Sequence, residues 1–336
     1  MGSPLAWVLF NVTVLGLLAL DLGVFHRRAH AVSIREAAGW TAFWVGLSLL
    51  FNLGIYLFAG RDEALEFLAG YLIEKSLAVD NLFVFVLIFS YFGVPAAYQH
   101  RVLFWGILGA LIMRAAFILA GAYVLQKYDW VFYVFGALLI VTGIRMGIRD
   151  EAAIDPAQSR LLRIARRVLP LTDGFRGTHF FVRENGRTYA TPLLLVLIFI
   201  EFSDLVFAID SIPAIFAITL DPFIVYTSNV FAILGLRSMY FLLAGVIHRF
   251  VYLKYALAFV LVFVGIKMIL EDVLHVPILA SLAIIATALA IGVLTSLRAS
   301  ADHDADAAPD DMVGPDDADE RDNAASAEHE PGGNLP

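Results

Sequence analysis

Long runs of apolar residues, separated by short polar segments, recur along most of this 336-residue chain. A helix of about 20 predominantly apolar residues is long enough to cross the hydrocarbon core of a bilayer. The pattern therefore predicts an all-α polytopic membrane protein of about nine transmembrane helices. The expected spans cover roughly residues 4–25, 38–59, 64–92, 101–125, 130–149, 191–219, 222–247, 252–272 and 277–298.

The third and sixth spans contain segments that read as copies of each other. The first runs from Glu74 to Leu82 and the second from Asp204 to Ile212, and each places two carboxylates six residues apart. The fifth and eighth spans also match, with Gly143-Ile144-Arg145-Met146 against Gly265-Ile266-Lys267-Met268. Because the repeated unit holds three spans, its second copy enters the membrane from the opposite side. The sequence thus predicts an inverted three-helix repeat with a pseudo-two-fold axis in the membrane plane.

This repeat organises the rest of the chain. Two helices would precede the first unit, a polar loop would separate the two units, and a ninth helix and a tail would follow. The expected segments are 1–60 for two N-terminal helices, 61–150 for the first repeat, 151–190 for a basic loop, 191–274 for the second repeat, 275–300 for the ninth helix and 301–336 for the tail.

Composition and charge agree with this class. Only 16% of residues are charged, against about 25% in soluble domains. The tail 301–336 holds 12 acidic residues and one Arg, so residues 1–300 carry a net +3 although the whole chain carries −8. Basic residues fall in alternate connections between the spans, which by the positive-inside rule predicts an external N-terminus and a cytoplasmic C-terminus.

The loop 150–190 is the longest connection. Arginines mixed with apolar residues over 160–169 predict a short amphipathic helix on the inner membrane surface. Residues 179–189 predict a small β-hairpin around Asn185-Gly186. The arginines either only fix the topology or also bind lipids or a regulator. The tail 301–336 lacks apolar periodicity and is expected to be disordered.

Carboxylates at membrane depth usually mark the path of an ion, a proton or a substrate. Pro213 should bend or unwind its helix beside Asp210 and free a backbone carbonyl there. Carboxylate, amide, hydroxyl and carbonyl oxygens suit Mg²⁺, Mn²⁺ or Ca²⁺ better than soft metals, and the chain has no Cys. The candidate metal ligands are Glu74, Asp80, Asn81, Asp204, Asp210, Ser211 and Glu201.

These acidic groups cannot all be ionised in a dry cavity. A divalent cation would neutralise two of them, and without it some would take protons, which is the logic of a cation–proton antiporter. The structural alternative is that Glu74 or Asp80 pairs with Lys75, Arg114 or Arg237 and only holds helices together. Arg114 and Arg237 occupy equivalent spans and would then be counter-ions, gates or structural partners.

Three function classes follow from these residues. The first is a divalent cation exporter that works by alternating access, with the lipid bilayer, the cation and protons as its partners. The second is a membrane assembly or scaffold protein that binds partners through the basic loop and the tail. An intramembrane enzyme has no nucleophile motif, His pair or cofactor signature in its favour, so we expect no catalytic residues and no bound cofactor. No nucleic-acid partner is indicated, and the sequence leaves the oligomeric state open.

At these residues the chain resembles the TerC family of integral membrane proteins, and its Alx-type branch in particular. The resemblance covers about residues 20–291 and excludes the acidic tail. The segments that carry it are 74–81, 180–186, 208–217, 221–229 and 235–237. It implies a protein of the bacterial inner membrane associated with Mn²⁺ efflux, metal homeostasis or tellurium resistance. It also implies that the acidic and polar positions of both repeated segments form the metal site.

Overall fold

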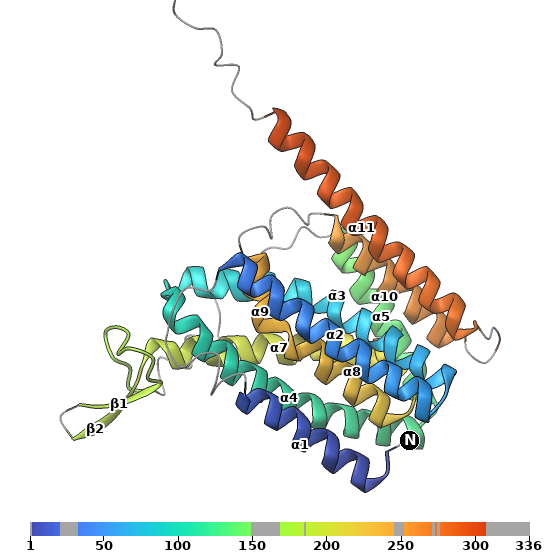
Figure 1. Cartoon of the computed structure of the whole chain (residues 1–336), viewed down its shortest axis with the longest axis horizontal. Helices are drawn as coiled ribbons and strands as arrows, with labels where there is room; N and C mark the ends of the chain where they lie inside the picture. The colour runs from blue at the N-terminus through green and yellow to red at the C-terminus, as the bar shows by residue number, and fades with distance from the viewer. Residues whose placement is uncertain are drawn as a thin grey trace, which may run out of the picture.

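The computed structural model describes residues 2–20, 33–148, 169–184, 186–244, 252–270, 273 and 276–306. This part of the chain is mostly helical and holds one two-stranded sheet (Figure 1). The helices are α1 (Pro4–Leu20), α2 (Ile34–Phe58), α3 (Arg61–Tyr91), α4 (Ala96–Lys127), α5 (Trp130–Ile148), α7 (Pro192–Phe216), α8 (Pro222–Leu234), α9 (Leu236–Leu243), α10 (Leu253–Ile269) and α11 (Ile278–Asp306).

Within the described residues, five helices are long and apolar enough to cross a membrane, namely α2, α4, α5, α7 and residues 278–299 of α11. Residues 4–19 of α1 and helix α8 are apolar but shorter. Helix α3 is 31 residues long, but charged residues are spread along it, so it is not among these five. An all-α membrane architecture is therefore supported, while the count of nine spans remains a prediction.

The expected seventh span, 222–247, is not one continuous helix. Helix α8 ends at Leu234 and α9 begins at Leu236, so the helix breaks at Gly235. At its start, the Asp221 carboxylate accepts hydrogen bonds from the backbone N–H groups of Phe223 and Ile224, which is the usual way to satisfy the free donors of a helix N-terminus.

Helix α7, by contrast, continues through Pro213 as far as Phe216. Of the predicted bend or unwinding beside Asp210, the unwinding is therefore wrong, although Pro213 still has no N–H to offer the Ile209 carbonyl. A proline ring removes one backbone donor and crowds the carbonyl four residues earlier, but every residue from Ser211 to Phe216 is buried. Packing on all sides holds this last turn helical, and the discontinuity of the bundle lies at Gly235 instead.

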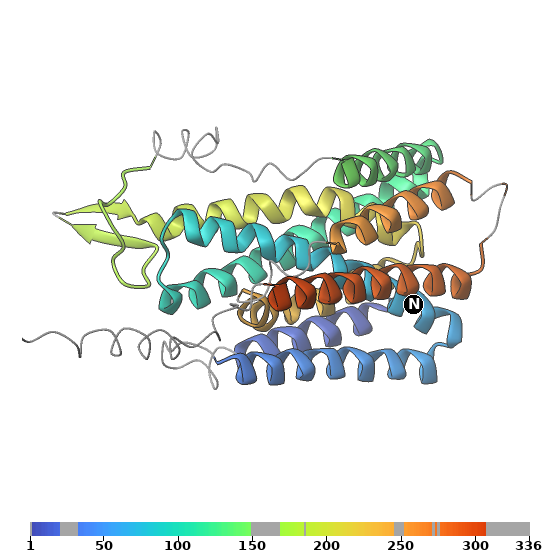
Figure 2. The ribbon, with the colours of Figure 1, turned by 90° about the horizontal axis from the view of Figure 1, so that it is seen from above.

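Helices α5 and α10 pack closely side by side (Figure 2). A β-carbon at Gly143 would lie 2.7 Å from the Ala258 carbonyl oxygen, and one at Gly265 would lie 2.7 Å from the Gly136 carbonyl oxygen. Residues later in α5 thus meet residues earlier in α10, so the two helices run antiparallel. Small residues at the contact let the backbones approach, as is common between membrane helices.

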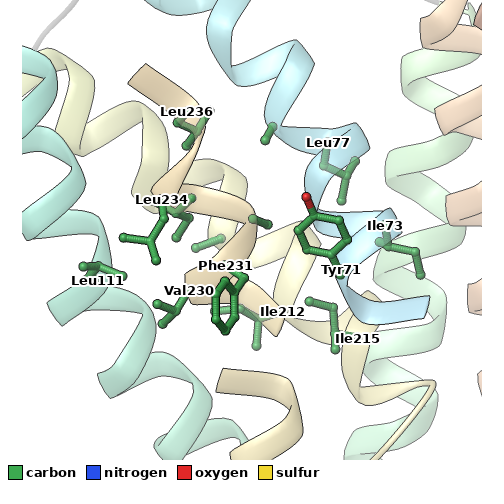
Figure 3. Close-up of a cluster of buried hydrophobic side chains, with 14 of the residues drawn as sticks. Tyr71, Ile73, Leu77, Leu111, Ile212, Ile215, Val230, Phe231, Leu234 and Leu236 are labelled. Atoms are coloured by element: carbon green, nitrogen blue, oxygen red, sulfur yellow. The ribbon is translucent and has the colours of Figure 1, made fainter. Parts of the chain in front are cut away.

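The interior of the bundle is an apolar cluster where α3, α4, α7, α8 and the start of α9 meet (Figure 3). The labelled side chains, all buried, are Tyr71, Ile73, Leu77, Leu111, Ile212, Ile215, Val230, Phe231, Leu234 and Leu236. Two of these helices, α3 and α7, carry all seven predicted ligands.

The predicted hairpin is confirmed. Strands β1 (Phe181–Glu184) and β2 (Arg187–Ala190) pair antiparallel, with Glu184 opposite Arg187, and both views place the pair at one end of the molecule, beyond the helices (Figures 1 and 2). The predicted amphipathic helix over 160–169 lies outside the described residues, apart from its last residue. Helix α11 extends to Asp306, past the expected boundary at 300, and the remainder of the tail lies outside the described part.

We predict that Gly143→Val and Gly265→Val each destabilise the protein by about 1–3 kcal/mol, because overpacking at a close backbone contact forces the helices apart. Gly147→Ala is the matched control, since its β-carbon would meet Ala258 at an ordinary 3.6 Å. Thermal unfolding of the purified variants in detergent measures the effect. Equal stability of all three variants would show that the α5–α10 contact is looser than described.

Candidate cation site

Four helices bring charged and polar groups together at one buried point, which we call the Arg114 cluster: Arg114 (α4), Glu74 (α3), Asp204 (α7) and Asn229 (α8). Arg114 is 1% exposed, Glu74 0% and Asp204 3%. Arg114 pairs with Glu74 through Nη1. It donates from Nη2 to Asp204 Oδ1 at 3.1 Å and from Nε to Asp204 Oδ2 at 3.4 Å.

The Asn229 side chain completes the coordination of Arg114. Its Oδ1 accepts from Arg114 Nη1 at 2.6 Å, while its Nδ2 donates to the Val225 carbonyl one turn earlier in α8. That second bond fixes the orientation of the amide, so its oxygen faces the guanidinium. Asp204 is held through both oxygens, the two-point geometry in which arginine binds carboxylates most strongly.

Two oxygens at this cluster are not used by Arg114. Glu74 Oε2 and Ser211 Oγ are buried and have no hydrogen-bond partner among the described residues. The Ser211 hydroxyl lies close to the Glu74 carboxylate, so the two oxygens face the same small region. These two oxygens therefore have each other as neighbours and no further partner among the described residues, and a bound water or ion is one way to complete their hydrogen bonding.

Two lysines, Lys75 (half-buried) and Lys267 (buried), cap the helices that carry this cluster. Lys75, next to Glu74 in α3, donates to the Ala232 carbonyl at 3.1 Å, near the end of α8. Lys267 of α10 donates to the Ala217 carbonyl at 3.3 Å, where α7 ends. A cation at a helix C-terminus offsets the partial negative charge of the free carbonyls there. The lysines thereby stabilise the C-terminal ends of α8 and α7.

Glu201 lies one turn before Asp204 in α7 and close to it. Its carboxylate rests on the backbone of α4 at Gly109, where an added β-carbon would overlap the carboxylate oxygens. Glu201 is half-buried, and the structure records no ion pair or hydrogen bond for it within the described residues. It is therefore a spare carboxylate beside the Arg114 cluster.

Asp210 is placed elsewhere. Its Oδ1 accepts a hydrogen bond from the Thr142 hydroxyl of α5 at 3.0 Å, and Arg145, also in α5, lies close enough to attract it. The structure thus separates Asp210 from Asp204. Asn81 is buried in α3, and the side chain of Asp80 lies outside the described part of the structure.

The seven predicted ligands accordingly do not form one site as they stand. Glu74, Asp204 and Ser211 come together, Glu201 lies beside them, and Asp210 binds α5. Among the described residues, no group of three or more Asp, Glu or His side chains is arranged to hold a metal. Arg114 joins the carboxylates of Glu74 and Asp204. From the sequence alone, its role could be that of a counter-ion, a gate or a structural partner.

Asn229 is not among the ligands predicted from the sequence. Its available signal was a polar triplet, Thr227-Ser228-Asn229, inside an apolar helix. Only Asn229 turns toward the charged cluster, because the hydroxyls of Thr227 and Ser228 bond back to carbonyls of their own helix.

Comparison with known proteins gives consistent relatives. The model of the integral membrane protein TerC family matches residues 59–304. The chain is 54% identical to the membrane protein STKORF319 of Myxococcus xanthus over 91% of this chain and 97% of the relative. Two further relatives, each 53% identical, are named as candidate membrane-bound redox modulators, Alx. The one from Salmonella typhi matches over 88% of this chain and 93% of its own length. The one from Escherichia coli K12 matches over 85% of this chain and 92% of its own length. No solved structure matches.

We predict that Glu74→Gln lowers the stability of the purified protein by about 1.5–3 kcal/mol, because it removes a charge-assisted hydrogen bond to the buried Arg114 while Asp204 still balances the arginine's charge. Glu66→Gln, a half-buried position on the same helix, is the control and should change little. Thermal unfolding in detergent compares them. If the two variants unfold alike, the ion pair between α3 and α4 contributes nothing to stability.

Proposed function

Since the chain belongs to the TerC family of integral membrane proteins, we propose that it exports divalent metal cations, with Mn²⁺ as the favoured substrate. The observation that carries this proposal is the meeting of Glu74 and Asp204, from the two repeated segments, at one buried point. Acidic groups so deep inside a helical membrane protein are costly to keep and usually serve ion passage.

The donor atoms fit such a cation. Around the Arg114 cluster lie the two oxygens of Glu74, the two oxygens of Asp204, the amide oxygen of Asn229 and the hydroxyl of Ser211. All are hard oxygen ligands, which Mn²⁺ and Mg²⁺ accept in octahedral geometry. Sulfur is absent from the set, and the chain contains no cysteine, so soft metals are disfavoured.

The proposal includes two inverted halves that alternate access to this point. Reciprocal contacts between α5 and α10 support a two-fold relation. Gly143 faces Ala258, Leu261 and Val262, while Gly265 faces Gly136, Leu139 and Ile140. Each residue of the first set matches one of the second at an offset of 122. Such pairing is what a two-fold axis between antiparallel helices produces.

The remaining packing supports the same relation. Helix α3 packs on α8, and α4 packs on α7. If α3 corresponds to α7 and α4 to α8, a two-fold rotation turns the first of these contacts into the second. We propose nine spans, an external N-terminus, a cytoplasmic C-terminus and a location in the bacterial inner membrane. Proton exchange would balance part of the cation charge, and no enzymatic activity or resident cofactor is part of the proposal.

A redox role is the second candidate, because relatives of this chain are named for one. This chain has no cysteine, so thiol–disulfide exchange within it is impossible. A scaffold role through the loop 151–190 is the remaining alternative, and it predicts that the loop matters more than the carboxylates.

In proteoliposomes loaded with a Mn²⁺-sensitive dye, we expect Asp204→Asn and Asp210→Asn each to reduce Mn²⁺ transport at least about tenfold, because each removes a charge that the cation or its coupled proton needs. Glu184→Gln, on the exposed hairpin, should transport as the unsubstituted protein does. Parallel assays with Ca²⁺, Mg²⁺ and tellurite test the substrate. Unchanged Mn²⁺ transport by both Asp variants would reject the site, and activity lost only on deletion of the loop would favour the scaffold role.

A further inference from the structure

Arg114 occupies the position that a divalent cation would take. Its guanidinium contacts Glu74, both oxygens of Asp204 and the amide oxygen of Asn229, which are the same donors that suit Mn²⁺. A guanidinium and a metal ion cannot share these oxygens at bonding distance. Arginine also keeps its charge in proteins, so it cannot make room by losing a proton. A cation can therefore bind here only if Arg114 moves.

We propose that Arg114 is a tethered counter-ion that exchanges with the transported cation: when the cation binds Glu74 and Asp204, Arg114 leaves them and pairs with Glu201. This inference rests on the proposed function, because it assumes that the cation binds at the Arg114 cluster. It assigns Glu201 a role other than metal ligand, namely the acceptor of the displaced arginine.

Glu201 lies on the same two helices, α7 and α4, that hold Asp204 and Arg114. It lies three residues before Asp204 in α7, so the two carboxylates share one face of the helix. Its carboxylate rests on α4 at Gly109, five residues before Arg114, which is about 7.5 Å along a helix axis. Long side chains on a helix lean toward its N-terminus, and this is the direction from Arg114 to Gly109. Residues five apart differ by about 140° around a helix, so the exchange requires the arginine side chain to swing around α4 as well as along it.

Charge balance requires such a partner. In the structure, two buried carboxylates face one guanidinium. A divalent cation between Glu74 and Asp204 would neutralise both and leave the charge of Arg114 unpaired inside the bundle. An unpaired buried charge is strongly destabilising, whereas Glu201 supplies a carboxylate that lies against the helix of Arg114 and has no ion pair among the described residues. Gly109 keeps that position open, because any larger residue would displace the Glu201 carboxylate.

A double-mutant cycle of Mn²⁺ binding to the purified full-length protein tests the exchange. Isothermal titration with MnCl₂ should show that Arg114→Gln binds Mn²⁺ about tenfold or more tightly than the unsubstituted protein, because the competing charge is gone. Glu201→Gln should weaken binding about tenfold when Arg114 is present. In the Arg114→Gln background, Glu201→Gln should have no further effect. Arg183→Gln on the hairpin is the control for loss of a positive charge far from the site.

Gly109→Ala gives an independent test if Arg114→Gln fails to fold. It keeps every charge and should weaken Mn²⁺ binding as Glu201→Gln does, because it pushes the Glu201 carboxylate off α4. Equal weakening by Glu201→Gln with and without Arg114 would make Glu201 a direct ligand and overturn the exchange. Weaker binding by Arg114→Gln would also overturn it. Absence of both binding and transport in the unsubstituted protein would instead reject the proposed function, and the exchange with it.

Discussion

Pairing of charge inside a low-dielectric bundle is the constraint on which the arrangement of this protein depends. Arg114 sits between Glu74 and Asp204 with almost no exposure to solvent, and each of the three charges would be very costly alone. Since they come from α4, α3 and α7, the pairing fixes how these helices are rotated against one another. Asn229 extends the same constraint to α8.

The ends of the inner helices obey the same rule. A membrane interior cannot supply water to the free carbonyls of a helix that stops inside the bundle. Lys75 and Lys267 meet this need at the ends of α8 and α7. Positive charge therefore has two uses among these residues: Arg114 holds carboxylates, and Lys75 and Lys267 bind the carbonyls at helix ends.

Much of this could be predicted from sequence, because apolar length and the repeat of charged positions are local properties. The helices and the hairpin follow from such signals. The partners of the carboxylates could not be predicted. A separation of six residues places Asp210 about 120° from Asp204 around the helix, so the two side chains face different neighbouring helices. Which helix each one meets is set by tertiary packing. The break at Gly235 was also hidden, because Pro213 gave a stronger local signal that packing overrides.

The contacts between α5 and α10 have the form of an isologous interface, the kind that joins two identical subunits across a two-fold axis. In a dimer of identical chains, a substitution would alter both sides of the interface together. Here the two sides belong to one chain and can vary independently. The two sides do differ. Gly143 meets Ala258, whereas Gly265 meets Gly136 at the equivalent position. Gly143 also meets Val262, whereas Gly265 meets Ile140. Two helices of one chain can thus acquire an asymmetry that a symmetric assembly of one gene product could not.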